Sequence, residues 1–467
     1  MKPFVHDITG IDPLAAFAAI KHMPYSLLLD SADRAHPASR YSFVMGQPIE
    51  TIEAKGHKIS ITNWEQRLSF TGNPFAILEE RLNVWVPQTT RIPNMPPFQG
   101  GAAGLFGYDL GRILEKIPAT AKDEKNVPDM AIGIYDQVLA HDHLLKKSWI
   151  FTHARNAQEA TRKRDHFISL LTREVEPPSY EPVELDWYAN FNRKTYSAAV
   201  QKVIDYIHAG DIFQANIAQR FDAQLPDEFD PFIHYVHLRK VNPAPFAAYM
   251  NLGKVKLSSS SPERFLTLKD NKVETCPIKG TRPRLSNFTK DRANQKDLLS
   301  SEKDRAENTM IVDLLRNDLS KVCEPHSIEV PALCKLESFA SVHHLVSTIT
   351  ARLKGECGPI DLLRACFPGG SITGAPKIRA MEIIEEIEPT RRAAYCGSIG
   401  YIGFDGSMDT NILIRTLSFH NNKVSLQTGG GIVAESDPES EYQETLDKAH
   451  KILDSFGEQD PNLKIAV

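Results

Sequence analysis

The sequence has few of the features that mark secreted, membrane-bound or disulfide-stapled proteins. Its 467 residues include six cysteines with no CxxC pair, so reduced thiols are expected rather than a disulfide or zinc framework. No window approaches the ~20 consecutive apolar residues that span a bilayer. The N-terminal segment carries a proline and two acids where a signal peptide would need an apolar core. We therefore expect a cytoplasmic protein with no membrane contact.

An excess of positive charge is also missing. The formal net charge is −5, which provides no basic surface for nucleic acid, so partners are expected among small molecules and other proteins. No internal repeat or low-complexity run is present. Hydrophobic and charged contents of 42% and 24% are ordinary for a globular protein, and the length allows one large or two medium domains.

One break in the pattern divides the chain. Residues 174–186 (EVEPPSYEPVELD) are rich in proline and acids and show almost no apolar periodicity, which is typical of a linker. This segment separates an N-terminal region, residues 1–175, from a C-terminal region, residues 187–460. We expect the two regions to pack as one globular unit.

Strands and helices follow one another without a strict βαβ rhythm. Before the linker, strand-like pieces such as YSLLLDS and AIGIYDQVLAHD are broken by the glycine-rich GGAAGLFGYDLG. After it, TYSAAVQKVIDYIHAGD is typical of an amphipathic helix, and strands are predicted at residues 398–404, 410–419 and 423–427. This arrangement favours an α+β architecture over a doubly wound parallel sheet.

Two predicted helices carry acids at helical spacing. In EKDRAENTMIVDLLRNDLSKV, Asp304 and Glu307 lie three residues apart and share a face. In ESEYQETLDKAHKILDSF, which follows a Ser-Asp-Pro start signal, Glu441, Glu444 and Lys448 recur on one face. Each face could be an ordinary solvated surface. Together the helices could instead supply up to four carboxylates for a hard cation such as Mg²⁺.

Two glycine-rich segments could accept an anion through backbone N–H groups. GGSITGAPK is not a P-loop, because Ala375 follows Gly374 where lysine is required, and it is better interpreted as a turn into a helix whose N-terminus suits a carboxylate. QTGGGIV, with Gly429 and Gly431, could let backbone approach an anion, or could form a hairpin or bulge.

Three single residues remain ambiguous on pattern alone. Arg415 alternates with apolar residues in the strand-like TNILIRTL, and a buried arginine there needs a carboxylate partner. His344 has two interpretations, a hydrogen-bonded core histidine or a catalytic one. In ETCPIKGTRPR, Lys279 lies between a strand end and a tight turn predicted at Gly280, and composition alone favours a surface lysine.

Taken together, these segments resemble the chorismate-utilising enzymes. SSSPERF, PIKGTRPR, ENTMIVDLLRNDL, GGSITGAPKIRAMEIIEEIEPTRR, YCGSIGYIGFDGSMDTNILIRT and TGGGIV are similar to family segments in the family's order. The N-terminal half is similar more loosely, through LLLDS, RYSF and GGAAGLFGYDLG. The resemblance implies an α+β fold of two large packed antiparallel β-sheets flanked by helices, with the active site in a cleft of the C-terminal part.

The resemblance also implies roles for individual residues. Glu307 and Glu444 would bind Mg²⁺ directly, with Asp304 and Glu441 near it through water, and the ion would hold the ring carboxylate of chorismate. Arg415, Tyr395 and the backbone at Gly429 and Gly431 would hold the enolpyruvyl carboxylate. The remaining members of the implied pocket are Ser371, Thr373, Lys448 and His344.

A few positions separate the branches of this family. Isochorismate and salicylate synthases carry a lysine base at the position matching Gln214, and glutamine cannot take that proton. Anthranilate synthases have alanine where this chain has Lys279, and a lysine there is typical of the branch that makes aminodeoxychorismate. Lys279 would attack C2 of chorismate while Glu263, the implied general acid, protonates the leaving C4 hydroxyl. The other interpretation of Glu263 is an ion pair with Arg264 or another base.

The resemblance extends to partners. No GxCxG elbow of a glutaminase is evident, since AYCGSIG lacks the first glycine, so ammonia is expected from a separate glutamine amidotransferase subunit. Several members of this branch bind tryptophan, and Ser31 with Pro243 and Pro245 matches that site in outline. Two alternatives remain to amination at C4: an anthranilate synthase large subunit, and a non-catalytic relative that binds amino acids.

Overall fold

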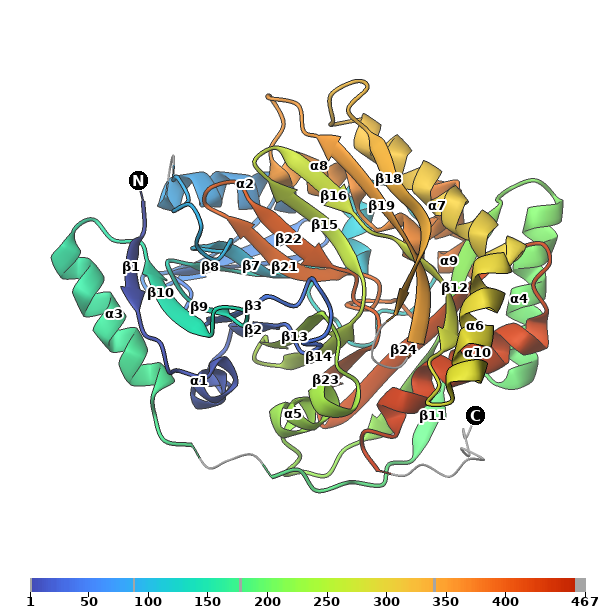
Figure 1. Cartoon of the computed structure of the whole chain (residues 1–467), viewed down its shortest axis with the longest axis horizontal. Helices are drawn as coiled ribbons and strands as arrows, with labels where there is room; N and C mark the ends of the chain where they lie inside the picture. The colour runs from blue at the N-terminus through green and yellow to red at the C-terminus, as the bar shows by residue number, and fades with distance from the viewer. Residues whose placement is uncertain (1, 87–88, 176–178, 339–341, 458–467) are drawn as a thin grey trace.

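Two long β-sheets pack face to face in the computed structural model, which describes residues 2–86, 89–175, 179–338 and 342–457 (Figure 1). Within these residues each sheet has twelve strands, and the strand ladders are antiparallel. Helices cover the outer faces. The predicted α+β class, with two large packed antiparallel sheets, is confirmed.

The first sheet contains strands from both ends of the chain. Its spatial order is β1 (Phe4–Asp7), β10 (Lys147–Thr152), β9 (Gln137–Asp142), β3 (Tyr41–Met45), β2 (Ser26–Asp30), β13 (Phe246–Asn251), β14 (Val255–Ser261), β23 (Thr416–His420), β24 (Lys423–Ile432), β12 (Gln214–Gln224) and β11 (Trp187–Ala189), with β20 (Gly374–Ala375) beside β12.

The second sheet is built in the same way. Its order is β17 (Ile278–Pro283), β19 (Val342–Arg352), β16 (Lys272–Thr275), β15 (Arg264–Lys269), β22 (Met408–Asn411), β21 (Ser398–Gly403), β7 (Gly101–Phe106), β8 (Met130–Tyr135), β4 (Glu50–Lys55), β5 (Lys58–Asn63) and β6 (Arg67–Thr71), with β18 (Glu329–Ser338) beside β19. Strand β7 occupies the first half of the glycine-rich GGAAGLFGYDLG, which the sequence pattern treats as a break, so that interpretation was wrong for residues 101–106.

Most of the described α-helices begin where the sequence offers a capping side chain, and two begin at Gly358 and Pro376 without one. Asp437 caps α10 through the N–H of Ser440, with Pro438 in the first turn, as the Ser-Asp-Pro signal predicts. The helices are α1 (Pro13–Ile20), α2 (Pro74–Trp85), α3 (Ala157–Leu171), α4 (Arg193–His208), α5 (Pro231–Val241), α6 (Phe288–Ser300), α7 (Glu302–Ser320), α8 (Pro359–Cys366), α9 (Lys377–Ile387) and α10 (Pro438–Leu453), with 3-10 turns η1 (Tyr108–Ile113) and η2 (Gly370–Ile372).

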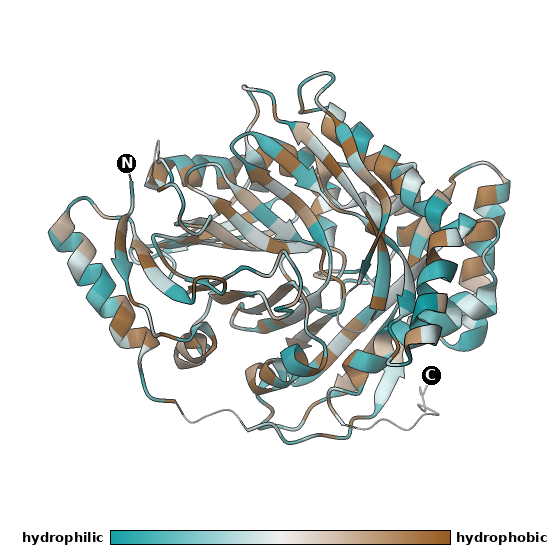
Figure 2. Ribbon diagram, viewed as in Figure 1, coloured by the Kyte–Doolittle hydropathy of each residue, from teal (hydrophilic) through white to brown (hydrophobic). Residues whose placement is uncertain are grey.

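The inner faces of the sheets share a hydrophobic core. Phe43 of the first sheet meets Tyr401 of the second at a ring-centroid distance of 5.7 Å, and Phe98 stacks on Tyr401 at 4.4 Å. Burial of aromatic rings of this size is a large part of what holds two sheets together. Figure 2 shows the contrast with α6 on the outside, which is largely teal and buries only Leu298.

Both sheets take strands from either side of the predicted linker. Strand β2 pairs with β13, and β7 pairs with β21. The described residues of the linker, 174–175 and 179–186, form neither helix nor strand, as predicted. Residues 458–460 of the expected C-terminal region lie outside the described residues. None of the described helices is long and apolar enough to span a membrane.

Two of the places where the chain passes from one sheet to the other are neighbours in space. Strand β14 of the first sheet leads into β15 of the second through Pro262 and Glu263, and β22 of the second leads into β23 of the first through residues 412–415. The single strand predicted at 410–419 is therefore wrong. Arg415 lies between two strands with φ of 51°, in the left-handed region.

Candidate active site

Lys279 lies on a strand at a β-bulge. In β17 it pairs with Leu345 of β19, and the register shifts by one residue before Thr281 pairs with His344. Gly280, with φ of +73°, is the extra residue, so the tight turn predicted there is wrong. The strand continues to Pro283 because β19 supplies ladder partners throughout. Bulges re-aim side chains, and this one sets the direction of Lys279.

The crossing at Pro262 and Glu263 and the crossing at residues 412–415 are hydrogen-bonded to each other. The N–H of Ile412 donates to the carbonyl of Glu263 at 3.0 Å, and the hydroxyl of Ser261 donates to the carbonyl of Ile412 at 2.6 Å. The N–H of Ser260 donates to the carbonyl of Arg415 at 3.0 Å. These bonds hold Glu263 and Arg415 side by side, although they are far apart in sequence.

Glu263 is a buried carboxyl. Burial raises its pKa to about 7, although the Ser371 hydroxyl and the Lys279 amine favour the charged form. Arg264 turns away and donates to Asp409 at 3.1 Å, so the Glu263–Arg264 ion pair considered from the sequence is wrong. A carboxyl that keeps its proton near neutral pH is suited to act as a general acid.

The four predicted metal carboxylates lie on α7 and α10, which are joined by an ion pair. Lys303 of α7 approaches Glu441 of α10 at 3.5 Å, and the Ser436 hydroxyl donates to Glu441 at 2.7 Å. Burial raises the pKa of Glu441 and of Glu307. The charges of Asp304 and Glu441 add to the rise at Glu307.

Lysines and an arginine balance this negative charge. Lys448 lies 2.6 Å from Glu444 and lowers the pKa of that carboxyl. Arg282 approaches Asp304 at 3.3 Å. Lys279 favours the charged forms of Glu307 and Glu444, which places its amine among the carboxylates.

The donor chemistry of this cluster fits a hard cation. Carboxylate oxygens are the ligands that Mg²⁺ prefers, and these four repel one another in a partly buried site. Among the described residues, no three His, Cys, Asp or Glu side chains converge on a common point, and Lys303 and Lys448 pair with the α10 carboxylates. The metal roles of these residues stay a prediction.

His344 lies one strand away from Lys279. Its Nδ1 is 2.9 Å from the Thr281 hydroxyl and 3.2 Å from the Gly280 carbonyl. Since a carbonyl can only accept, Nδ1 carries the proton in that contact. Burial and the neighbouring Arg415 lower the pKa of His344 to about 3, so the ring is neutral. Both interpretations of His344 fit this geometry, because it is buried, hydrogen-bonded and beside the charged cluster.

The glycines of QTGGGIV lie within β24 and are neither a hairpin nor a bulge. Gly429 and Gly431 pair with Ala218 and Asn216 of β12. A Cβ at Gly431 would lie 2.0 Å from the amide nitrogen of Gln214 and 3.3 Å from the amine of Lys279. The absence of a side chain therefore leaves room for these two groups, and the side-chain amide oxygen Oε1 of Gln214 has no hydrogen-bond partner among the described residues.

The remaining pocket residues surround this group unevenly. Ser371 contacts Glu263, and Lys448 donates to the Gly429 carbonyl at 2.9 Å. The Thr373 hydroxyl donates to the Gly369 carbonyl at 3.0 Å, within its own turn. Tyr395 is buried beside the Arg392 guanidinium, 5.7 Å from the ring centroid. It also lines an interior cavity with Thr416 and Gln427.

The expected tryptophan site lies in another part of the first sheet. The N–H groups of Ala32 and Asp33, which follow Ser31, donate to the Ala244 carbonyl at 3.1 Å, between Pro243 and Pro245. The Ser31 hydroxyl donates to the backbone carbonyl of Tyr41 at 2.6 Å. The structure brings the two segments together, and tryptophan binding stays a prediction.

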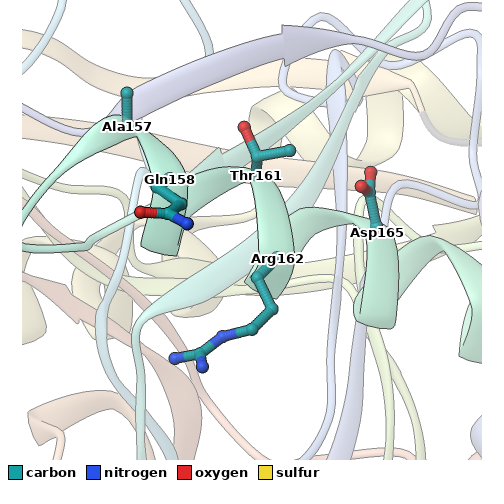
Figure 3. Close-up of a pocket in the computed structure, with 5 residues that line it drawn as sticks. All are labelled: Ala157, Gln158, Thr161, Arg162 and Asp165. Carbon is teal, nitrogen blue, oxygen red and sulfur yellow. The ribbon is translucent and has the colours of Figure 1, made fainter.

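A surface hollow on α3 is unrelated to these residues. All five of its lining side chains come from that one helix: Ala157, Gln158, Thr161, Arg162 and Asp165 (Figure 3). None of them is an expected site residue, and one helix face brings no distant groups together.

Three residues that contact the predicted site residues were not singled out from the sequence. Lys303 pairs with Glu441, Arg282 with Asp304, and Thr281 with His344. Lys303 lies four residues before Glu307 on the same helix, and Thr281 lies two residues after Lys279, so spacing could have indicated both. The contact between α7 and α10 could not be inferred from spacing.

Comparison with known proteins decides the family. The family model for the chorismate binding enzyme matches residues 26–454. The chain belongs to the chorismate-binding enzymes.

Relatives within the family differ in reaction. The chain is 45% identical over 439 residues to aminodeoxychorismate synthase component 1 of Escherichia coli (strain K12). The alignment covers 94% of each chain. It is 37% identical to anthranilate synthase component 1 of Bacillus subtilis (strain 168), over 97% of this chain and 91% of the relative. The solved structure of anthranilate synthase component I from Streptococcus pneumoniae TIGR4 matches with a TM-score of 0.80 at 31% identity, covering 90% and 93% of the two chains.

The raised pKa of Glu263 predicts a pH dependence. If Glu263 is the acid of this chorismate-binding enzyme, kcat/KM should fall about tenfold per pH unit above ~7, at a constant concentration of free ammonia. Glu263→Gln should lower kcat by roughly 100-fold or more while the chain stays folded.

Stability supplies an independent measurement on the same carboxyl. The pKa of Glu263 is higher in the folded chain than in the unfolded chain. The contribution of Glu263 to the free energy of unfolding is therefore full at low pH and is lost as pH rises through about 7. Glu263→Gln should therefore be more stable than the wild type in urea at pH 9 and no more stable at pH 4. If the free energies of unfolding of the variant and the wild type differ by the same amount at both pH values, the Glu263 carboxyl is not held protonated in the folded chain.

Proposed function

We propose that the protein converts chorismate and ammonia into 4-amino-4-deoxychorismate, the reaction of aminodeoxychorismate synthase, which provides the precursor of 4-aminobenzoate and folate. The observation that carries the proposal is Lys279, whose amine lies beside Gly431 and among the carboxylates. Identity of 45% to an aminodeoxychorismate synthase component 1 supports the same reaction.

The side chains at the site suit a two-step substitution. The neutral Lys279 amine attacks C2 of chorismate, both ring double bonds shift by one position, and the C4 hydroxyl leaves as water with a proton from Glu263. The adduct nitrogen returns a proton to the Glu263 carboxylate. Ammonia then bonds to C4, both double bonds shift back, and the C2–N bond breaks. The proton released from the new C4 ammonium passes to the departing lysine, so the net change is amine for hydroxyl.

Mg²⁺ belongs to the same proposal. Glu307 and Glu444 would hold it directly, with Asp304 and Glu441 near it through water. When bound, the ion supplies positive charge for the ring carboxylate of chorismate. Arg415 lies beside Glu263 at the crossing, where its guanidinium suits the enolpyruvyl carboxylate.

Ammonia would come from a separate glutamine amidotransferase subunit. The similar proteins are named as component 1 enzymes, which supports a second component. Cys396, the cysteine nearest to an elbow motif, is buried, and burial raises its pKa to about 12, so it is a poor nucleophile. Tryptophan at Ser31, Pro243 and Pro245 remains part of the proposal, supported by the contact between these segments.

Product analysis tests the reaction directly. The purified chain is incubated with chorismate, Mg²⁺ and an ammonium salt, and the product is identified by mass spectrometry. We expect an aminated ring that keeps its enolpyruvyl group. Anthranilate with free pyruvate would instead support the anthranilate synthase alternative, which is favoured by the 37% relative and by the structural match.

The role of Lys279 predicts a large loss on truncation. Lys279→Ala should lower kcat by roughly 1000-fold, because the covalent route is lost. Lys335→Ala is the control, since this lysine on β18 has a side chain 67% exposed. Unchanged product formation by Lys279→Ala would exclude covalent catalysis by this residue.

The metal assignment predicts a loss that depends on Mg²⁺. Glu307→Gln or Glu444→Gln should lower Mg²⁺-dependent turnover by roughly 100-fold with the chain still folded, as measured by turnover against Mg²⁺ concentration. Glu439→Gln on α10 provides the control, because its side chain is 54% exposed and pairs with Arg193. Wild-type turnover in both site variants would contradict the assignment.

A further inference from the structure

Asn308 is a buried amide on α7 with both ends hydrogen-bonded to β19. Its Nδ2 donates to the Leu345 carbonyl at 3.2 Å, and its Oδ1 accepts from the Ser347 hydroxyl. Asn308 and Ser347 are fully buried. The side chain therefore joins a helix to a strand through two bonds shielded from water, where each counts for more than at a surface.

The contact continues into a third element. The Ser347 hydroxyl also accepts the N–H of Cys334 at 2.9 Å, where the ladder between β18 and β19 shifts register. Cys334 has φ of 52°, so its N–H is turned out of the regular ladder and finds the hydroxyl instead. We call Asn308, Ser347 and Cys334 the α7 clasp. Each polar group in it has a partner, which is the condition for a buried network to stabilise one arrangement.

The clasp lies directly behind the active site. Asn308 follows Glu307 in the helix, and Leu345 is both the residue after His344 and the register partner of Lys279. One end of the amide is thus next to a predicted metal carboxylate. The other end holds the strand that positions Lys279.

Neighbouring contacts of α7 do not duplicate this link. Lys303 and Arg282 reach Glu441 and Asp304 through flexible, partly exposed side chains. Pairs of that kind hold position weakly, whereas a two-bond buried amide fixes both the distance and the rotation of the helix.

We propose that Asn308 is a positioning residue that holds α7 against β19 and so sets the Glu307 carboxylate relative to the Lys279 amine. This inference rests on the proposed function, in which the Glu307 carboxylate holds the metal and the Lys279 amine attacks the substrate. Truncating Asn308 removes the side-chain donor to the Leu345 carbonyl and the acceptor of the Ser347 O–H, and lets the first half of α7 move. The fold keeps its cores, since α7 also packs through Ile311, Leu315 and Leu319.

Metal affinity is the readout that a purely structural role would not move. Mn²⁺ is titrated into the full chain and the free ion is measured by electron paramagnetic resonance, beside thermal unfolding and turnover with chorismate and ammonium. For Asn308→Ala we expect Mn²⁺ affinity to fall about tenfold or more and kcat to fall by a similar factor. Asn317→Ala, an exposed asparagine on the same helix, should change neither.

Ser347→Ala keeps the inference testable if Asn308→Ala fails to fold. It removes one of the two bonds of Asn308 and should weaken Mn²⁺ binding in the same direction, and the double variant should lose less than the product of the two single losses. Mn²⁺ affinity within twofold of wild type in the folded variants would overturn the inference, as would an equal loss in Asn317→Ala or no Mn²⁺ binding by the wild type. Failure of the proposed function appears separately, as wild-type chain that binds Mn²⁺ and forms no aminated product.

Discussion

The site depends on two chain crossings that are hydrogen-bonded to each other. Glu263 and Arg415 lie where the chain leaves one sheet for the other, and the bonds between Ile412 and Glu263 and between Ser260 and Arg415 hold these turns together. Strand ladders of both sheets flank each crossing. The Glu263 carboxyl and the Arg415 guanidinium are thus held by backbone that is hydrogen-bonded on both sides.

Charge balance organises the part of the site formed by α7, α10 and Lys279. Burial and the charges of Asp304 and Glu441 raise the pKa of Glu307, and burial and the charge of Glu444 raise that of Glu441. Lys279, Lys303 and Lys448 favour the charged forms of these carboxylates. The Lys279 amine is close both to Glu263 and to the carboxylates suited to a cation, which is the arrangement that the proposed reaction requires. The bulge at Gly280 and the missing side chain at Gly431 give the amine its direction and its space.

Local patterns predicted much of this structure. Helical spacing and caps were enough to predict the helices α4, α7 and α10 from the sequence. The ordered motifs indicated the family and the two packed sheets. The crossings could not be predicted, because TNILIRTLSF has the apolar alternation of a single strand. The segment is divided only because β22 finds its partners in one sheet and β23 in the other. Gly280 had a similar ambiguity, since a positive φ is needed equally in a turn and in a bulge. The contact between α7 and α10 depends on residues more than a hundred positions apart, which no periodicity encodes.

The central claim is that Lys279 forms a bond to the substrate. It is tested most directly by incubating the wild-type chain with chorismate and Mg²⁺ without ammonia, quenching in acid and mapping the adduct by peptide mass spectrometry. The account predicts a mass increase equal to chorismate minus water, on the peptide that contains Lys279 and absent from Lys279→Ala. No adduct, or an adduct on another residue, would contradict it.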